Sequence, residues 1–244
     1  MKTAYLDEIR QLDLFHSMQD ENFEAVMRGA YVQSFPPLVD LIHEGDGSDF
    51  LHVIIDGSVE LYATWSGKET TISIVRPVST FILAATIRNA PYLMSAKTLE
   101  RSRIVMLPSE DVRRIFDADS GFARAVVREL ATCYRASIKH TKTLKLRTSL
   151  ERLANYILQE SAARNGVDAY VLDLEKRKLA SLLGMTPENM SRAIKALSPY
   201  GVHIDGSRVV IENRAELERF ARPAPSSTIH RPESCNLQSF YPRK

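Results

Sequence analysis

Three side chains in the last third of the chain have the types and the spacing needed to contact DNA bases. Glu188, Ser191 and Arg192 are expected to lie one helical turn apart on the solvent face of one helix. A carboxylate accepts from cytosine N4, an arginine can bridge guanine O6 and N7, and a hydroxyl can serve several bases. One C·G pair could therefore bond both charged residues, so these three form the predicted base-reading set.

The stretch 179–197 supplies the elements that would position them. Gly184 stands where a left-handed residue ends a helix, and Thr186 followed by Pro187 is typical of a helix start. Apolar residues fall at helical spacing on both sides: Leu179, Leu182, Leu183, then Met190, Ala193, Ile194 and Leu197. Two short helices joined by a tight turn are typical of a helix-turn-helix, although two ordinary core helices are the commoner arrangement.

The segment that follows favours the DNA-binding interpretation. Val202 to Ile211 alternates apolar and polar residues around Asp205-Gly206, a two-residue hairpin signal. A hairpin directly after the second helix predicts a winged helix-turn-helix. The predicted phosphate contacts are the polar and basic residues Thr186, Asn189, Lys195, Lys176, Arg177, Lys178 and Arg208. The alternative for the basic ones is an ordinary solvated surface.

Composition and charge fit a two-part protein. The chain has 244 residues, of which 44% are apolar and 25% charged. Residues 1–141 contain 15 Lys and Arg against 19 Asp and Glu, whereas residues 142–222 contain 14 against 10. With two cysteines, Cys133 and Cys235, no disulfide framework is expected. The chain has no apolar run of membrane-spanning length and no signal-peptide pattern at its start, so a cytoplasmic protein without membrane contact is expected.

The front of the chain predicts short helices followed by a β-structure. Residues 1–30 place apolar residues among acids, and His16 lies there as an ordinary surface or packed histidine. Residues 31–107 alternate short β-prone runs with Gly and Asp turns, which is typical of a small sandwich or barrel.

A long helix is expected from about Asp119 to Arg147. Its residues Val126, Leu130, Cys133, Ser137, His140 and Leu144 alternate at spacings of four and three, which predicts a dimer seam. The alternative is a helix buried within one subunit. Cys133 and His140 on a dimer axis could be redox or ligand groups, but a space-filling role is the simpler interpretation.

The run HEGDGSDFLHVIIDGSVELYATWSGKETTISIV resembles the β-roll of cyclic-nucleotide-binding-like domains. Together with the winged helix, it makes residues 10–220 similar to the CRP/FNR family of bacterial transcription regulators. The resemblance implies an α+β chain with a β-roll (double-stranded β-helix) sensor at 1–116, a dimerisation helix at 117–147 and a winged helix-turn-helix at 148–222. The Pro- and Ser-rich composition after Arg222 predicts a mobile tail at 223–244. It also implies a homodimer, a palindromic double-stranded DNA operator and contact with RNA polymerase. The regulator is expected to be an activator, and the sequence leaves repression open as the alternative.

Within that family the run PENMSR resembles the FNR-like branch, which binds TTGAT-like half-sites. Pro187 stands where the CRP branch has an additional arginine, so a CRP-type half-site is not expected.

The sensor cassette departs from the nucleotide-binding members. They carry Gly-Glu-Leu and then Arg-Ser, whose Glu takes the ribose and whose Arg pairs the phosphate. Here Phe81 and Ile82 stand for Gly-Glu, and Ala90 and Pro91 for Arg-Ser, with Arg88 two positions away. A buried cyclic phosphate would lack its partner, so cyclic nucleotide binding is not expected. A cyclic-AMP-responsive, CRP-like regulator remains the alternative.

The predicted effector pocket is the apolar set Phe81, Ile82, Leu83, Ile87, Leu93 and Met94, which would suit an apolar effector such as haem. His16, His43, His52 and His140 leave a haem ligand open, and no pair is singled out. Two cysteines cannot hold the iron–sulfur cluster of FNR itself.

Two other classes of protein could contain such a β-structure. A cupin-like metalloenzyme would need several clustered histidines, but the strand region offers only His43, His52 and the adjacent Glu44. A cyclic-nucleotide module serving another protein would need the missing Glu and Arg. We therefore expect a regulator, with no enzyme activity and no metal site.

Overall fold

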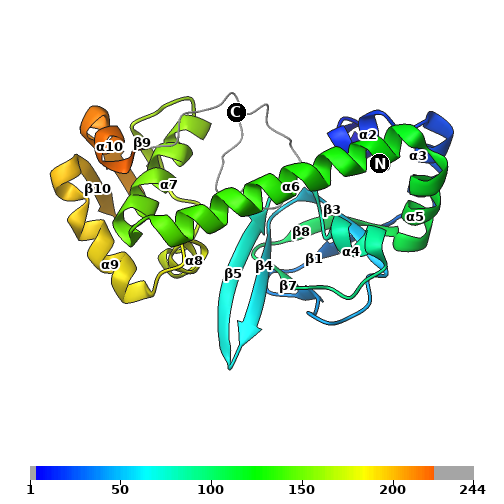
Figure 1. Cartoon of the computed structure of the whole chain (residues 1–244), viewed down its shortest axis with the longest axis horizontal. Helices are drawn as coiled ribbons and strands as arrows, with labels where there is room; N and C mark the ends of the chain where they lie inside the picture. Colours follow the sequence, from blue (N-terminus) through cyan, green and yellow to red (C-terminus); the bar gives the residue numbers. More distant parts are fainter. Residues whose placement is uncertain (1–3, 223–244) are drawn as a thin grey trace. The chain divides into compact units, whose positions relative to one another are not determined.

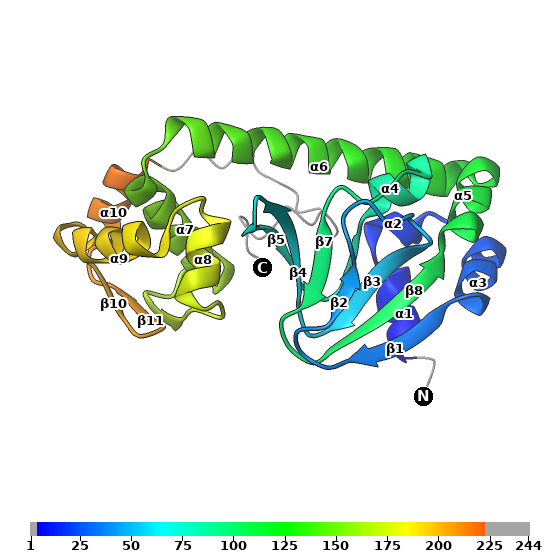
Figure 2. The ribbon, with the colours of Figure 1, turned by 90° about the horizontal axis from the view of Figure 1, so that it is seen from below.

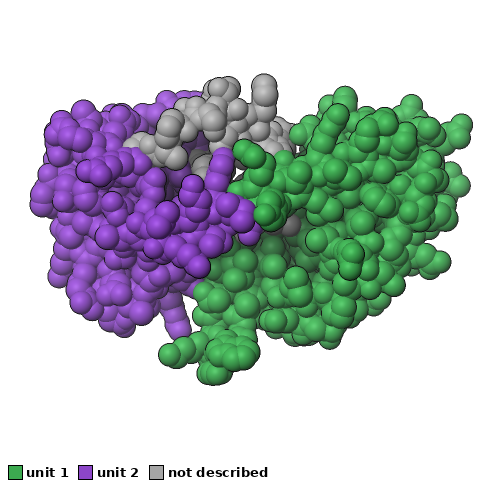
Figure 3. All heavy atoms as spheres, in the orientation of Figure 1, with its two compact units in different colours: residues 1–136, 232–238 green, residues 137–231, 239–244 purple. Residues whose placement is uncertain are grey.

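The structure is a computed structural model, and it describes residues 4–222. The chain divides into two compact units, and the division falls between Ala136 and Ser137, inside one long helix (Figure 3). Each unit is described separately below.

The first unit is a β-roll with helices against one sheet (Figures 1 and 2). Three helices come first: α1 (Ala4–Arg10), α2 (Asp13–His16) and α3 (Asp20–Arg28). One four-stranded sheet has the order β1 (Tyr31–Phe35), β8 (Ser102–Pro108), β3 (Phe50–Asp56), β6 (Ser79–Phe81). The other has the order β2 (Asp40–Ile42), β7 (Ser95–Thr98), β4 (Val59–Trp65), β5 (Lys68–Val75). The predicted β-roll is thus confirmed.

Alternation along the central strands gives this unit two cores. Leu51 and Val53 of β3 point toward the helices, where they join Phe15 and Phe122 in a fully buried cluster. Ile54, on the opposite face of β3, lies between the two sheets with residues such as Phe81. Side chains of successive strand residues face opposite sides, so one strand serves both cores.

Helix α4 (Leu83–Arg88) lies within the roll between β6 and β7, and α5 (Ser109–Ala118) and α6 (Ser120–Leu146) lead from β8 to the second unit. The Asp119 carboxylate fixes the start of α6: Oδ1 accepts from the backbone N–H groups of Gly121 and Phe122, at 2.9 and 3.0 Å. Oδ2 accepts from the Gln19 N–H and the Asn22 side chain, at 2.8 and 3.0 Å. Burial alone would raise the pKa of Asp119, but these hydrogen bonds outweigh it and hold the pKa below its ordinary value.

The second unit is a winged helix-turn-helix. Helix α7 (Ser149–Ala163), which begins with a capping box from Thr148 to Glu151, precedes strand β9 (Ala169–Val171). Then come α8 (Lys176–Leu182), α9 (Pro187–Ala196), the 3-10 turn η1 (Ser198–Tyr200), β10 (Val202–Asp205), β11 (Arg208–Ile211) and α10 (Arg214–Ala221). The sheet order is β10-β11-β9.

The wing turn lies one residue later than predicted. Asp205 pairs with Arg208, so the two-residue loop is Gly206-Ser207 and not Asp205-Gly206. Gly206 has φ of +56°, and glycine at the first loop position is the pattern of a type II′ turn. The predicted mobile tail, 223–244, lies outside the described residues.

Candidate DNA-binding surface and sensor cassette

The turn between α8 and α9 has the geometry that its sequence predicts. Gly184 has φ of +63°, its N–H donates to the Ser181 carbonyl at 2.9 Å, and the Met185 N–H donates to the Ala180 carbonyl at 3.0 Å. These two bonds form a Schellman motif, which satisfies the last carbonyls of α8 and reverses the chain. The following helix can then begin within two residues.

Helix α9 is fixed at its start by its own side chains. The Thr186 hydroxyl accepts from the Asn189 N–H at 3.2 Å, and Pro187 occupies the first helical position. Both are stabilising choices where the first N–H groups of a helix have no internal partner. The orientation of α9 at its first turn is therefore determined locally.

The two faces of α9 divide as expected. Met190 and Ala193 are buried, together with Leu197 just after the helix. The opposite face exposes the residues Glu188, Asn189, Ser191, Arg192 and Lys195. The polar side chains are thus free to enter a DNA groove, while the apolar ones hold the helix to its unit.

Two of the three predicted base-reading residues, Glu188 and Ser191, already make hydrogen bonds within α9, which determines the groups they can present to a base. Hydrogen bonds from its own backbone N–H and from Thr186, with the Arg192 charge, hold the pKa of Glu188 below its ordinary value, so it stays an acceptor. The Ser191 hydroxyl donates to the Pro187 carbonyl at 3.0 Å within the helix. While this bond is made, Ser191 offers a base its acceptor lone pairs.

The predicted phosphate contacts are exposed with one exception. Exposed are Thr186, Asn189, Lys195, Lys176, Arg177 and Arg208, the last on the wing. Lys178 is half-buried. The exposed basic residues lie on α8, α9 and the hairpin of a single compact unit.

Sequence reasoning missed one residue that positions this surface. Arg152 of α7 donates to the carbonyls of Leu183 at 2.8 Å, Gly184 at 3.1 Å and Arg147 at 2.7 Å. One guanidinium thereby ties the turn before α9 to the end of α6. The available signal was an arginine next to Leu153 on the inward face of α7, where an unpaired charge would be costly.

The predicted dimer seam does not form one open stripe on α6. Val126 is fully buried in the helix-side core of the roll, and Leu130 packs against the same core. Leu144 lies beside Gly184, where its Cδ2 comes within 2.8 Å of the position a Cβ would take. An apolar stripe is exposed instead on the neighbouring face of α6, at Val127, Ala131, Tyr134 and Ile138.

Two other members of that seam, Cys133 and His140, are half-buried. The Cys133 sulfur lies 3.7 Å from Glu129 Oε1 on the preceding turn, and Cys235 lies outside the described residues. Burial together with the Arg152 charge lowers the pKa of His140. Cys133 and His140 are therefore not simple apolar contacts for a partner helix.

The six predicted effector-pocket residues do not line a common cavity. Phe81 and Met94 belong to the core between the sheets, with Ile82 beside them, whereas Leu83 and Ile87 belong to the helix-side core. Leu93 is 81% exposed. The backbone turns at Ile82, which has φ of +63°, so successive residues of this run diverge to different cores.

Among the described residues, the histidines form no haem pocket either. His16 and His43 are exposed, and His52 is buried between the sheets, where its ring stacks on Phe81 at a centroid distance of 4.9 Å. Burial lowers the pKa of His52 to about 4. The apolar residues around it are tightly packed core, so the residues present do not fit a haem. Within residues 4–222 there is no cluster of three or more His, Cys, Asp and Glu placed to hold a metal ion.

Comparison with known proteins agrees with both units. A family model described as a cyclic nucleotide-binding domain matches residues 32–119, and one described as a Crp-like helix-turn-helix domain matches residues 151–220. No curated protein matches the chain.

No helix in the described part is both long and apolar enough to cross a membrane.

Several solved structures share the fold. A candidate cyclic nucleotide binding protein from Ruegeria pomeroyi is 25% identical with a TM-score of 0.58, over 89% of this chain and 96% of that one. FixK2 from Bradyrhizobium japonicum is 20% identical with a TM-score of 0.68, over 81% and 99%. A mutant of CooA from Carboxydothermus hydrogenoformans is 16% identical with a TM-score of 0.68, over 81% and 90%.

A cyclic nucleotide-binding domain followed in the same chain by a Crp-like helix-turn-helix, on the fold of FixK2 and CooA, identifies the chain as a DNA-binding transcription regulator of the CRP/FNR family.

Proposed function

We propose that this regulator binds a palindromic operator with TTGAT-like half-sites as a homodimer. The observation that carries the proposal is the exposed Glu188, Ser191 and Arg192 face at the start of α9, on a helix held by a cap and a Schellman turn. Arg192 would bridge guanine O6 and N7, and the ionised Glu188 would accept from cytosine N4 of the same pair. The wing and α8 would add phosphate contacts through Arg208 and Lys176.

The dimer would form through the exposed stripe of α6, not through the seam that spacing alone predicts. Tyr134 is 68% exposed, Val127 60% and Ile138 45%. Contact of so many large apolar side chains with water is unfavourable for a single helix. These residues and Ala131 recur at spacings of four, three and four, which suits packing against a second copy of the same helix. A symmetric pair would give two reading heads for a palindrome.

The sensor unit would respond to an effector other than a cyclic nucleotide. Although the matched domain family takes its name from that ligand, the positions that would hold ribose and phosphate carry Ile82, Ala90 and Pro91 here. Arg88, the nearest candidate for the phosphate, is an exposed residue at the end of α4. A buried anion without a cationic partner is strongly disfavoured.

The remaining features follow from the family. We infer that the regulator acts in the cytoplasm as an activator that contacts RNA polymerase, and that it catalyses no reaction. No haem role is included, because the packed core around His52 and the scattered apolar residues of the cassette do not fit one.

Fluorescence anisotropy with a labelled TTGAT palindrome tests the operator. We expect binding at least 10³-fold tighter than to a scrambled duplex at the same salt concentration. Equal affinity for both duplexes would disprove the half-site assignment. Calorimetry with cyclic AMP and cyclic GMP tests the sensor: micromolar binding coupled to tighter operator binding would disprove a non-nucleotide effector.

A further inference from the structure

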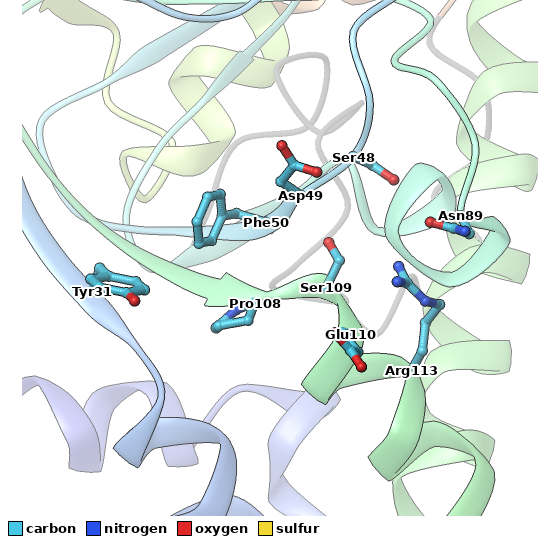
Figure 4. Close-up of a pocket in the computed structure, with 9 residues that line it drawn as sticks. All are labelled: Tyr31, Ser48, Asp49, Phe50, Asn89, Pro108, Ser109, Glu110 and Arg113. Atoms are coloured by element: carbon cyan, nitrogen blue, oxygen red, sulfur yellow. The ribbon is translucent and has the colours of Figure 1, made fainter.

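A pocket of about 310 Å³ lies where α5 begins, and no part of the proposed DNA-binding function uses it (Figure 4). Four separate segments of the first unit contribute to it. The lining residues are Tyr31, Ser48, Asp49, Phe50, Asn89, Pro108, Ser109, Glu110 and Arg113. Figure 4 shows Ser109 and Arg113 rising from the first turn of α5 toward Ser48 and Asn89.

One polar group on the buried side of this pocket lacks a partner. Ser109 is only 2% exposed; its N–H donates to the Asp49 carbonyl at 2.8 Å, but its hydroxyl makes no hydrogen bond. The neighbouring lining residue Arg113 donates through Nη1 to the Thr86 carbonyl of α4 at 3.2 Å, which places α4 beside the pocket wall. Buried hydroxyls are normally paired, so the Ser109 hydroxyl indicates a place where a ligand would complete the bonding.

The charges at the rim favour a cation. Asp49 and Glu110 contribute two exposed carboxylates against one guanidinium, Arg113, part of which is already bonded to Thr86. The positive end of the α5 dipole is already met by Glu110 and Asp111 in its first turn. The pocket is therefore not an anion site.

The opposite wall is aromatic. Tyr31 and Phe50 pack edge to face with centroids 5.9 Å apart, and Tyr31 is 59% exposed. Aromatic rings accept both aliphatic carbon and ammonium groups against their faces. The wall would thus receive the carbon chain of a ligand whose charge is held at the rim.

From these observations we propose that the pocket binds a small organic ammonium ion, such as a diamine. Its ammonium group lies between the Asp49 and Glu110 carboxylates and donates to the Ser109 hydroxyl, and its carbon chain packs on Tyr31 and Phe50. The ligand would contact the first turn of α5, and α5 ends one residue before the Asp119 cap of α6. Ligand binding would therefore bear on the position of α6.

Isothermal titration calorimetry of the full chain with 1,4-diaminobutane at low salt tests this without DNA, so its outcome is independent of the operator and of the dimer. We expect one site per chain with a Kd on the order of 0.1–1 mM. Asp49→Asn and Glu110→Gln should each weaken binding about three- to fivefold, and the double variant about tenfold or more. Glu21→Gln, an exposed carboxylate on α3, is the matched control and should leave the Kd unchanged.

Three results would overturn the proposal. One is no binding of the diamine. Another is binding that the three single variants Asp49→Asn, Glu110→Gln and Glu21→Gln weaken equally, as for cations that condense on an acidic surface. The third is binding of succinate that Arg113→Gln abolishes, because the pocket would then select anions. Uncharged 1-butanol should not bind.

Discussion

Helices α9 and α4 are both short, but they are held in opposite ways. Helix α9 begins at a threonine cap in extended backbone and continues into Leu197 with right-handed geometry. Helix α4 has no side-chain cap, and left-handed residues stand at both ends: Ile82 with φ of +63° and Asn89 with φ of +48°. A left-handed, β-branched residue costs about 1–2 kcal/mol, which only the surrounding packing can offset.

The difference shows how each unit is suited to its task. The start of the recognition helix α9 depends mainly on hydrogen bonds made within a few residues, with Arg152 of the same unit as a further support of the turn before it. The sensor cassette depends on burial of residues such as Leu83 and Thr86 against the rest of the roll. A segment with local strain and distant support is the one whose position a ligand can change.

The largest expected effect separates buried from exposed positions on α6. Leu130→Asp should lower the free energy of unfolding of the first unit by about 3 kcal/mol or more, because it places a carboxylate against an apolar core. Tyr134→Asp should leave the fold intact and convert dimers to monomers. Thermal unfolding and sedimentation measure the two outcomes. A folded Leu130→Asp monomer beside a dimeric Tyr134→Asp variant would instead restore the seam through Val126 and Leu130.

Removing the polar clamp of the second unit should have the next largest effect. Arg152→Ala breaks three bonds to carbonyls and should cost about 2–3 kcal/mol of stability in that unit. Operator and random DNA should both bind more weakly, since the α8–α9 turn loosens. Arg152→Lys is the matched control and should recover only part of the loss, because a lysine cannot reproduce the planar fork. If Arg152→Ala left the midpoint of chemical denaturation unchanged, the three hydrogen bonds of Arg152 would not stabilise this unit.

The base-reading face allows a finer test. Arg192→Ala should weaken operator binding by about 1–3 kcal/mol and relax the preference at one G·C pair. Lys195→Ala, one turn away, should weaken binding to every sequence and reduce the salt dependence. Anisotropy titrations at several salt concentrations distinguish the two. Should both variants lose the same affinity on specific and random duplexes, Arg192 would be a phosphate contact.

The smallest effects test the contrast between the helix ends directly. Thr186→Ala should destabilise the second unit by about 1 kcal/mol, because the Asn189 N–H loses its partner. Asn89→Gly should stabilise the first unit by about 0.5–1 kcal/mol, because glycine adopts positive φ without a Cβ clash. Denaturant midpoints report both. A loss of stability in Asn89→Gly would mean that the asparagine side chain stabilises this end.

The parts of the structure that local chemistry determines were predictable from sequence. Gly184, Thr186 and Pro187 specify the turn of the helix-turn-helix through their own backbone preferences, and each occupies the expected position. The wing was misplaced by one residue, because glycine suits the first position of a two-residue loop as well as the second.

The parts determined by tertiary packing were not predictable. Two apolar stripes run side by side along α6, and spacing alone cannot tell which one the roll covers; Val126 lies on the covered stripe and Val127 on the exposed one. The pocket at α5 joins Tyr31, Asp49 and Arg113, which lie far apart in sequence, so no motif marks it. Arg152 was missed for the same reason, because two of its three carbonyl partners lie about 30 residues away in the sequence.

The Asp119 carboxylate also bears on the order in which the protein is made. Gln19 and Asn22 leave the ribosome about a hundred residues before the carboxylate that accepts their hydrogen bonds, and Tyr31 of β1 also precedes its partner Met106 of β8 by a long stretch of chain. Long sequence separations slow folding, because the loop must close before its contacts form. The first unit therefore cannot close during its own translation until the first turn of α6 has emerged, while the DNA-binding unit, whose contacts are shorter in sequence, is synthesised behind it.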